Sequence, residues 1–480
     1  MYMSNFYITT AIPYVNAKPH IGNAMDFLYA DITARYQRQQ GNEVLFATGA
    51  DEHGLKIAEK AEEKGISPQE LVDSLAPDWQ AFIAKAGISN DLFIRTTNPE
   101  HKKRVEAIWK NLSAYIYKDS YTGWYCVGCE EYKTDSHVKE TNNICPLHNR
   151  KYDEIQEENY FFKLSAFSER LTEAIKSDLL KITPKTRKNE ILQLFKEGLE
   201  DISVSRPSSK LSWGVPVPGD KSQTMYVWFD AVCNYITILG YPDHANFKDF
   251  WPANVQIIGK DILRFHAAIW PAILMGLELP LQEQLYVHGH VSSDGKKMSK
   301  SLGNVVDPEE VIDKFGLDAF RYYFARHIPS YDDGDFSWEK YENVYNSELA
   351  NELGNGVSRV AAMVRKYQSG IIGDVPPSEH DTTRYHEAIE EFRYDRALES
   401  VWEQVRGLNQ FIEEEKPWQL AKENDPDHLR EVLASMCSDL LEIAGLLIPF
   451  MPTTASKIQS VFSEGIIREL DGPLFPRSES

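Results

Sequence analysis

Residues 6–23 read FYITTAIPYVNAKPHIGN, and this stretch decides the fold. Its first part, Phe6–Ile12, is an apolar run of strand length, and a loop with prolines separates it from a helical pattern at Ile21–Gln40. Gly41 ends that pattern, and a second apolar run of strand length follows at Val44–Thr48. Short apolar runs that alternate with helices are typical of parallel βα units. The beginning of the chain therefore predicts one half of an open α/β sheet.

The other half of the sheet is predicted much later in the chain. Val255–Gly259 has the pattern of a buried strand that leads into a helix at Ile262–Met275, and Leu285–Val291 continues the sheet. Open α/β sheets bind ligands outside the carboxyl ends of their strands. We therefore expect the functional site where polar residues follow these strands, namely at His20, Asp51 and Asp261.

The pattern between the two halves and after them predicts further domains. Residues 112–225 contain aromatic and Gly-rich short runs with a cysteine cluster, which indicates an insertion. After residue 345 the apolar residues recur at helical spacing: from Ile389 to Phe411 they predict one helix that ends at Lys416–Pro417, and from Leu429 to Ile443 another. We predict five segments: a sheet domain in two halves (1–111 and 226–291), an inserted domain (112–225), a connector (292–345) and a helical bundle (346–480).

Composition restricts the class of protein. Of 480 residues, 42% are apolar and 26% are charged, as in ordinary globular proteins, and no apolar run is long enough for a transmembrane helix. The N-terminus, MYMSNFYITT, lacks a basic region ahead of a long apolar one, so we expect a cytoplasmic protein without a membrane anchor. The formal net charge of −21 argues against nucleic-acid binding, although short basic runs occur, for example at 101–104.

Residues 297–301 read KMSKS and form the sharpest motif. Lys297 and Lys300 flank small hydroxyl side chains, and two lysines on a loop can surround a triphosphate and neutralise charge on the phosphoryl group that is transferred. The alternative is an exposed basic loop with no ligand.

A second motif, Pro19–Asn23, stands at the predicted start of the first helix. The N-terminus of a helix presents free N–H groups and the positive end of the helix dipole to anions. Gly22 would let a nucleotide approach the backbone, and His20 could donate a hydrogen bond to a phosphate oxygen. Taken alone, a histidine here could equally be a helix cap.

The third group is a pair of short cysteine-containing motifs in the predicted insertion. Two ligand pairs, each with two intervening residues, are what a closed tetrahedral zinc site requires: Cys126 with Cys129, and Cys145 with His148. Because the protein would supply all four ligands, we predict one structural Zn²⁺ per chain. The remaining cysteines, Cys233 and Cys437, are interpreted as buried packing residues.

The two nucleotide-site motifs, in this order, resemble the signatures of class I aminoacyl-tRNA synthetases, and nearly the whole chain resembles the methionyl-tRNA synthetases. The segments that carry the resemblance are 11–16 with the HIGN motif, 48–54, 226–231, 258–261, 297–308 and 351–355 with Arg359. The insertion with its zinc knuckle is also similar to that family. The resemblance implies a Rossmann-type doubly wound sheet, a zinc-bearing insertion and an anticodon-binding helical bundle.

The resemblance also implies an activity and its residues. The enzyme would activate L-methionine with ATP and Mg²⁺ and transfer it to the terminal ribose of tRNA(Met), with the 2′-hydroxyl as acceptor. The residues implied for ATP and catalysis are His20, Gly22, Asn23, Asp261, Lys297 and Lys300. Those implied for methionine are Ile12, Asp51, Trp228, Ala231, Tyr235, Phe265 and His266, with Asp51 on the ammonium group. Those implied for the anticodon are Asn351, Asn355, Arg359 and Trp418.

Some of these residues have other interpretations. Trp228 and Phe265 could be core aromatics, and Trp418 could pack between helices. The sequence also departs from the family pattern at three positions. Asn23 stands where a second histidine is usual, His148 replaces a fourth cysteine, and Val232 replaces a frequent proline.

Three other functions deserve comparison. Synthetases for isoleucine, valine or leucine carry a larger editing insertion, and a cysteinyl enzyme would use zinc in its active site. A small-molecule nucleotidyltransferase would have no use for the helical bundle, and a non-catalytic tRNA-binding protein would not need an intact KMSKS motif. We also expect a monomer, since no further dimerisation domain follows the bundle.

Overall fold

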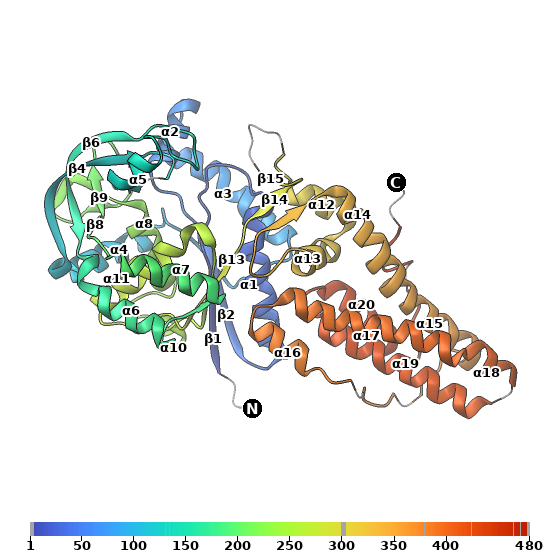
Figure 1. The fold of residues 1–480 in the computed structure, drawn as a ribbon. Helices are drawn as coiled ribbons and strands as arrows, with labels where there is room; N and C mark the ends of the chain where they lie inside the picture. Colours follow the sequence, from blue (N-terminus) through green and yellow to red (C-terminus); the bar gives the residue numbers. More distant parts are fainter. Residues whose placement is uncertain are drawn as a thin grey trace.

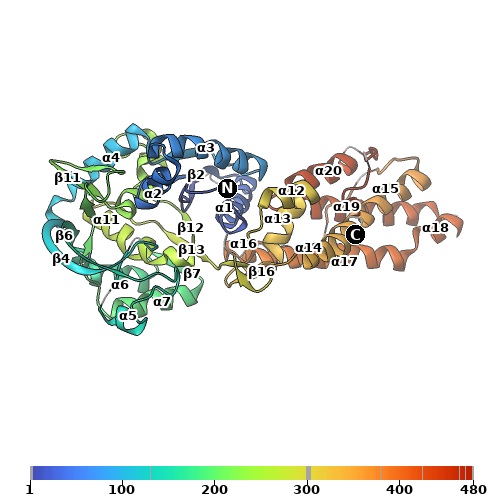
Figure 2. The same cartoon turned by 90° about the horizontal axis from the view of Figure 1, so that it is seen from above.

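The computed structural model describes residues 4–129, 131–133, 135–298, 304–373, 375–378, 380–423, 425–463, 465–470 and 472–477. The molecule is elongated, with the sheet-containing part at one end and a helical bundle at the other (Figures 1 and 2). No helix in the described ranges combines the length and the apolar character that crossing a membrane needs.

The main sheet has six parallel strands in the order β3-β2-β1-β12-β13-β7. Their bounds are β1 Asn5–Thr10, β2 Glu43–Ala50, β3 Leu92–Arg95, β7 Lys181–Thr183, β12 Val255–Gly259 and β13 Gln284–His288. The strand order reverses between β1 and β12, which pair with Ile8 opposite Val255. This is the order of a doubly wound Rossmann sheet, and ligands bind in such sheets at the reversal point. The predicted fold class is confirmed.

One strand of this sheet comes from an unexpected place in the chain. β7 lies inside residues 112–225, the range that we assigned to the insertion, and it pairs with β13. The rest of that range contains a separate sheet in the order β5-β4-β6-β8. Its strands are β4 Ile116–Cys126, β5 Glu131–Lys133, β6 Asp153–Phe162 and β8 Ile202–Ser203. The insertion and the main sheet are therefore interleaved along the chain.

Helices cover the main sheet and its insertions. Their bounds are α1 Ile21–Gln39, α2 Leu55–Lys64, α3 Pro68–Lys85, α4 Pro99–Asn111, α5 Asp135–Glu140, α6 Ser168–Lys176, α7 Lys185–Lys196, α8 Val227–Val232, α9 Asn234–Thr237, α10 Ala245–Phe250 and α11 Trp270–Gly276. Two small three-stranded sheets complete this part, with strands β9 Ser205–Pro207, β10 Pro216–Val217, β11 Asp220–Met225, β14 Val291–Ser293, β15 Lys296–Lys297 and β16 Gly334–Phe336.

The C-terminal part is helical, as predicted. Its helices are α12 Pro308–Phe315, α13 Leu317–Arg326, α14 Trp338–Val344, α15 Asn355–Gln368, α16 Thr383–Glu390, α17 Tyr394–Glu415, α18 Pro417–Glu423, α19 Pro426–Leu447 and α20 Pro452–Phe462. The prediction of a single helix from Ile389 to Phe411 is wrong, because the helix is interrupted between the end of α16 and the start of α17. Phe392 has a φ of 57° there, and its ring stacks on Tyr286 of the main sheet at a centroid distance of 4.7 Å. This non-local contact interrupts a locally favourable helix.

A buried ion pair joins the main sheet domain to the helical C-terminal part. Asp31 on α1 and Arg321 on α13 lie 2.7 Å apart, and both side chains are fully buried. Arg321 also donates to the carbonyl oxygens of Pro449 and Phe450, in the turn between α19 and α20. Removing one partner of a buried pair leaves an uncompensated charge, which costs several kcal/mol, roughly 3–5. The helix that begins at the nucleotide motif is thus fastened to the bundle.

Candidate active site and metal centre

The start of α1 lies at the point where the strand order reverses. His20 is the N-cap residue of α1, and its backbone N–H donates to Oδ1 of Asn23 at 3.2 Å. That bond uses the acceptor end of the Asn23 amide, so the donor end, Nδ2, is the part that can serve a phosphate oxygen. A Cβ atom on Gly22 would come within 2.9 Å of the His20 ring. A side chain at position 22 would therefore displace the His20 ring from its place over the first turn.

Asp51 lies at the carboxyl end of β2 and is 5% exposed. Its backbone bonds with the loop after β1: the Asp51 N–H donates to the carbonyl of Pro13, and its own carbonyl accepts from the N–H of Val15. Ile12 stands at the start of the same loop. A Cβ on Gly49 of β2 would lie 2.4 Å from the Ile94 carbonyl oxygen and 3.1 Å from the Ile12 side chain, so glycine there lets both residues pack against β2. The structure thus brings Ile12 and Asp51, which are far apart in sequence, to adjoining strand ends.

The predicted aromatic residues form a second group. Trp228 of α8 stacks on Phe265 with 3.9 Å between ring centroids and 9° between the planes. His266 lies edge-on to Trp228, and Tyr235 of α9 lies behind it. Trp228 and Phe265 are partly exposed, whereas Ala231, Tyr235 and His266 are buried. A partly exposed stacked pair beside buried polar groups is suited to form the wall of a pocket for an apolar ligand.

His266 is a neutral imidazole. Burial is the main reason why its pKa falls to about 4. Its Nδ1 lies 3.0 Å from the carbonyl oxygen of Ile262, so Nδ1 carries the hydrogen, and Nε2 accepts from the Tyr235 hydroxyl at 2.7 Å. The Tyr7 side chain of β1 is linked to α9 in turn, because its hydroxyl donates to the Tyr235 carbonyl oxygen at 2.9 Å. The aromatic group therefore has no net charge near neutral pH.

Sequence reasoning missed the residue that connects these two groups. Asp230, on α8 between Trp228 and Ala231, lies 2.6 Å from the ring of His53, two residues after Asp51. Both residues stand in segments that carried the family resemblance. Their pairing could not be read from the sequence, however, because 177 residues separate them.

Of the remaining predicted nucleotide-site residues, the structure places Asp261 at the end of β12. Asp261 follows β12, is largely exposed, and lies 3.3 Å from Nε2 of His290. The strand β15 pairs with β14 and is followed by Met298, which packs against the core. The Lys297 side chain and Lys300 lie outside the residues that the structure describes, so their predicted roles remain predictions.

The four predicted metal ligands converge at the tip of the insertion. Their ligand atoms all lie within 4.8 Å of one another. Cys129 Sγ is 3.6 Å from Cys145 Sγ, and each of these sulfurs is 3.5 Å from Nδ1 of His148. A tetrahedral zinc with bonds of about 2.3 Å to sulfur and about 2.0 Å to nitrogen requires separations of about 3.8 and about 3.5 Å. The cluster can therefore hold a metal ion of that size.

The backbone around the cluster is shaped for thiolate ligands. The N–H of Cys129 points at Cys126 Sγ, at 3.4 Å, as the knuckle geometry requires. A Cβ on Gly128 would come within 2.4 Å of the His148 ring, so only glycine leaves room for this ligand. Burial would raise the pKa of Cys145, but backbone N–H groups of Leu147 and His148 lower it on balance. Cys233 and Cys437 are buried elsewhere, as we predicted.

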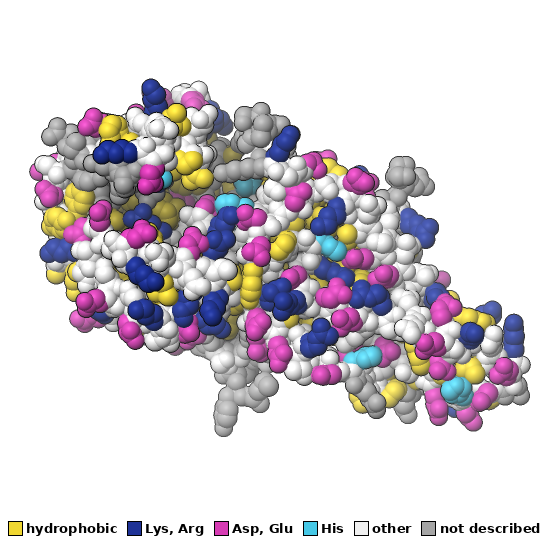
Figure 3. Space-filling model, in the orientation of Figure 1, with side chains coloured by type: hydrophobic (Ala, Val, Ile, Leu, Met, Phe, Trp, Pro, Cys, Tyr) yellow, Lys and Arg dark blue, Asp and Glu magenta, His cyan; other side chains and the backbone are white. Residues whose placement is uncertain are grey.

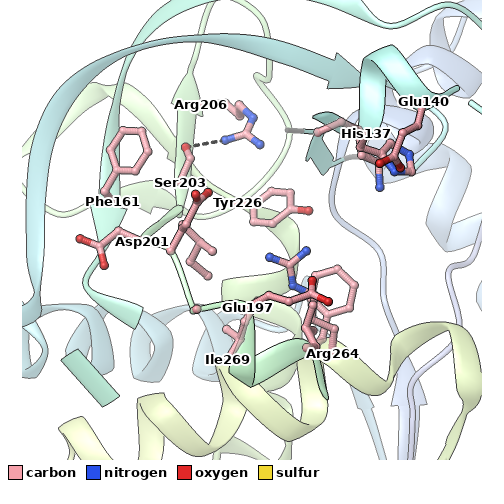
Figure 4. Close-up of a pocket in the computed structure, with 16 residues that line it drawn as sticks. His137, Glu140, Phe161, Glu197, Asp201, Ser203, Arg206, Tyr226, Arg264 and Ile269 are labelled. Carbon is pink, nitrogen blue, oxygen red and sulfur yellow. Dashed lines mark hydrogen bonds between the residues drawn. The ribbon is translucent and has the colours of Figure 1, made fainter. Parts of the chain in front are cut away.

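A cavity of about 600 Å³ adjoins the aromatic group. It is lined by the inserted sheet, the end of α7 and the segment 264–269 (Figure 4). Phe265 lines both this cavity and the stack with Trp228. Arg206 and Arg264 enter it from opposite sides, and several carboxylates also line it. The cavity is therefore lined by charged side chains, in contrast to the uncharged aromatic group. None of its charged residues was predicted as functional.

The predicted anticodon residues lie at the end of the bundle away from the main sheet, where α15 and α18 are in contact (Figure 1). Asn355 and Arg359 are one turn apart on α15, and Arg359 forms an ion pair with Glu413 at 2.6 Å. Asn351 accepts from Arg477 at 2.7 Å. Trp418, on α18, is partly exposed and packs on one side against the core. On the face in Figure 3, basic and acidic side chains are interspersed over the bundle.

Comparison with known proteins agrees with this geometry. The family model described as tRNA synthetases class I (M) matches residues 6–157 and 141–361. The methionine–tRNA ligase of Caldanaerobacter subterraneus subsp. tengcongensis is 42% identical over 471 residues, which cover 94% of this chain and 73% of that protein. That of Clostridium tetani is 43% identical over 475 residues, covering 95% and 74%. The chain belongs to the methionine–tRNA ligase family.

A solved member of the methionine–tRNA ligase family has the same fold throughout. Methionyl-tRNA synthetase of Mycobacterium tuberculosis, solved in complex with methionyl-adenylate, superimposes with a TM-score of 0.92 at 34% identity, over 99% of this chain and 100% of that one. Membership confirms the activity predicted from the sequence: the chain is an aminoacyl-tRNA ligase that acts on methionine. The three competing functions are thereby excluded.

Proposed function

We propose that the Asp51 segment and the aromatic group around His266 together form the methionine pocket. The observation that carries this assignment is the contrast between them: a buried carboxylate stands at one strand end, and a neutral, aromatic surface is linked to its segment by the contact of His53 with Asp230. An ammonium group needs a negative acceptor, whereas a thioether makes favourable contacts with aromatic rings and gains nothing from charge. Ile12, Ala231 and Tyr235 complete the walls.

The specificity of this pocket can be tested directly. We expect ATP–pyrophosphate exchange with the twenty amino acids to be supported by methionine far better than by any other. A neutral His266 offers no charge to a polar or acidic side chain, so these should be rejected. Equal exchange with leucine or isoleucine would show that the aromatic group does not select the thioether.

The nucleotide would lie across the start of α1, with His20 and Asn23 as donors to its phosphates and Gly22 as the point of closest backbone approach. Asp261 would bind the nucleoside from the end of β12. Lys297 and Lys300 would approach the phosphates from the KMSKS loop, with Lys300 stabilising the transition state. Mg²⁺ bound with ATP would supply further neutralisation of the polyphosphate charge.

The reaction would then proceed in two steps. The methionine carboxylate attacks the α-phosphate, the bond to the β-phosphate oxygen breaks, and pyrophosphate leaves. The 2′-hydroxyl of the terminal ribose of tRNA(Met) next attacks the carbonyl of the adenylate, and AMP leaves. The carboxylate is already a nucleophile, so the first step requires placement and charge stabilisation more than a general base.

We infer that the Cys126, Cys129, Cys145 and His148 cluster holds a structural Zn²⁺. The protein supplies four ligands, which leaves no open position for a substrate, and the ligand spacing fits tetrahedral zinc. In this position the metal would fix the tip of the insertion, where little apolar core is available: the local cluster of buried residues comprises Cys126, Val138, Cys145 and Tyr152.

Elemental analysis of purified protein is expected to find one zinc per chain, with X-ray absorption showing sulfur at about 2.3 Å. Cys129→Ser should lower the zinc content, because it removes one of the four ligands. Cys233→Ala, which removes a buried cysteine outside the cluster, should leave it unchanged. Cleanly purified protein without zinc would contradict the assignment.

We also propose that Asn351, Asn355, Arg359 and Trp418 read the anticodon. Single-stranded RNA is usually recognised by stacking splayed bases on aromatic or guanidinium planes and by reading their edges. The exposed positions of Asn351 and Asn355 and the partly exposed Trp418 suit this role. To bind RNA, Arg359 would give up its surface ion pair with Glu413. The loss of that ion pair would cost little free energy, because exposed ion pairs are weak.

Trp418→Ala is expected to lower aminoacylation efficiency by roughly 10- to 100-fold, since stacking one base on an aromatic is worth about 1–3 kcal/mol. Methionine-dependent pyrophosphate exchange should stay near wild type, because α18 lies at the far end of the bundle from the main sheet. Equal losses in exchange and aminoacylation, with a lower melting temperature, would show that Trp418 serves only to pack the helices.

The other expectations remain part of this proposal. The five segments predicted above would correspond to the two catalytic halves, the zinc-bearing insertion, the connector and the anticodon-binding bundle. The protein would work as a monomer in the cytoplasm, where charged tRNA is used for translation. Analytical ultracentrifugation and cell fractionation would test the last two points.

A further inference from the structure

A buried carboxylate joins the two groups that form the proposed methionine pocket. Asp230 lies on α8 between Trp228 and Ala231 and is 1% exposed. Its Oδ2 atom lies 2.6 Å from Nδ1 of His53, and its Oδ1 atom lies 2.8 Å from Nε2 of His101. Both imidazoles are equally buried. We call His53, Asp230 and His101 the Asp230 bridge.

The hydrogen positions in the Asp230 bridge follow from the chemistry of its members. Burial would raise the pKa of Asp230, but the two imidazoles hold it well below its usual range. An ionised carboxylate only accepts hydrogen bonds, so Nδ1 of His53 and Nε2 of His101 are both donors. The other ring nitrogen of His101 lies 2.7 Å from Oγ1 of Thr237. That of His53 is buried without a partner among the residues described.

The bridge connects three segments that are distant in the sequence. His53 is two residues beyond Asp51, and its backbone N–H lies 3.4 Å from Oδ1 of Asp51. Asp230 is next to Ala231 on the helix that carries Trp228, and His101 lies in the first turns of α4. The bridge thus gives a hydrogen-bonded route from the Asp51 segment to α8.

We propose that His53, Asp230 and His101 are positioning residues for methionine, which hold the ammonium acceptor Asp51 at a fixed separation from the aromatic wall on α8. The inference rests on the proposed role of Asp51. Methionine must engage both groups at once, and an active-site group displaced by a fraction of an ångström loses much of its contribution. His101 contacts Asp230 and Thr237 and acts on the substrate only through them.

Atom-matched variants of His101 give the sharpest test. The side-chain amide nitrogen of Asn (Nδ2) takes the position of Nδ1 in histidine. The side-chain amide nitrogen of Gln (Nε2) takes the position of Nε2 in histidine. His101→Gln should therefore keep the donor to Asp230, and His101→Asn should lose it. In pyrophosphate exchange we expect His101→Asn to raise the KM for methionine roughly tenfold, as loss of a hydrogen bond to a charged group predicts. The KM for ATP should not change, and His101→Gln should stay near wild type.

The matched variants of His53 should show the opposite order, because His53 donates through Nδ1. His53→Asn should stay near wild type and His53→Gln should raise the KM for methionine. If His101→Asn does not fold, this pair and the isosteric Asp230→Asn carry the test. Asp31→Asn is the control for the loss of a buried charge, because it also destabilises the sheet domain but should leave the KM for methionine unchanged.

Two results would overturn the proposal. In one, His101→Asn and His101→Gln lower the melting temperature alike and leave the KM for methionine unchanged, so that the bridge only stabilises the fold. In the other, the KM values for ATP and methionine rise together, so that the whole site is disturbed. Failure of the Asp51 assignment is distinguishable, because Asp51→Asn would then leave the KM for methionine unchanged whatever the bridge variants do.

Discussion

Asp51→Asn is expected to raise the KM for methionine in pyrophosphate exchange by about 10²-fold or more. Asn keeps the shape of the side chain and removes its charge, and truncating one partner of a buried charge pair costs about 2–5 kcal/mol. Asp51 is 5% exposed, so little solvent is available to replace the lost interaction with the ammonium. The KM for ATP should change little, because the proposed nucleotide site lies across the start of α1.

A methionine analogue without its amine separates charge recognition from general damage. 4-(Methylsulfanyl)butanoate has the side chain and carboxylate of methionine but no ammonium group. Its inhibition constant should be the same for wild type and Asp51→Asn. If the variant weakened the analogue as strongly as methionine, Asp51 would be supporting the pocket and not binding the ammonium.

Lys300→Ala is expected to lower the rate of methionine-dependent exchange by on the order of 10²-fold or more, since it removes a charge directed at the transition state. The affinity for methionine should barely change, because the lysine serves the phosphates. Lys296→Ala is a matched control: Lys296 is an exposed lysine on β15, immediately before the KMSKS motif, and its loss should have little effect.

The two readouts of this experiment have different meanings. A lower rate with unchanged methionine affinity supports the assignment of Lys300 to the transition state. An unchanged rate with weaker methionine binding would place Lys300 in the amino-acid site instead. Equal losses in Lys300→Ala and Lys296→Ala would mean that the basic loop acts only through its overall charge.

The features that sequence analysis predicted correctly are mostly local in the chain. The capped start of α1 depends on His20, Gly22 and Asn23, which are neighbours in sequence. The metal cluster needs two short motifs whose internal spacing already sets the knuckle, and Gly128 stands inside one of them. The alternation of strands and helices indicated the doubly wound sheet for the same reason, because each βα unit is a local pattern.

Other features depended on contacts between distant segments. The break between α16 and α17 falls at Phe392, whose ring stacks on Tyr286, although the spacing of apolar residues there favours a continuous helix. β7 joins the main sheet from inside the predicted insertion, since a three-residue strand has no pattern of its own and is defined by its partner β13. Neither result could be derived from the residues alone.

The sequence by itself determined the family, the sheet class and the residue types for nucleotide and metal binding, because each of them is carried by short motifs or local patterns in the chain. Only the tertiary structure decided how the methionine site is held together. Asp230 meets His53 and His101 across 177 and 129 residues, and Arg321 meets Asp31 across the domain boundary. The sequence does not show which residue will pair with a buried charged side chain. Such a side chain is stable only when folding brings donors to it, and that pairing is a property of the whole fold.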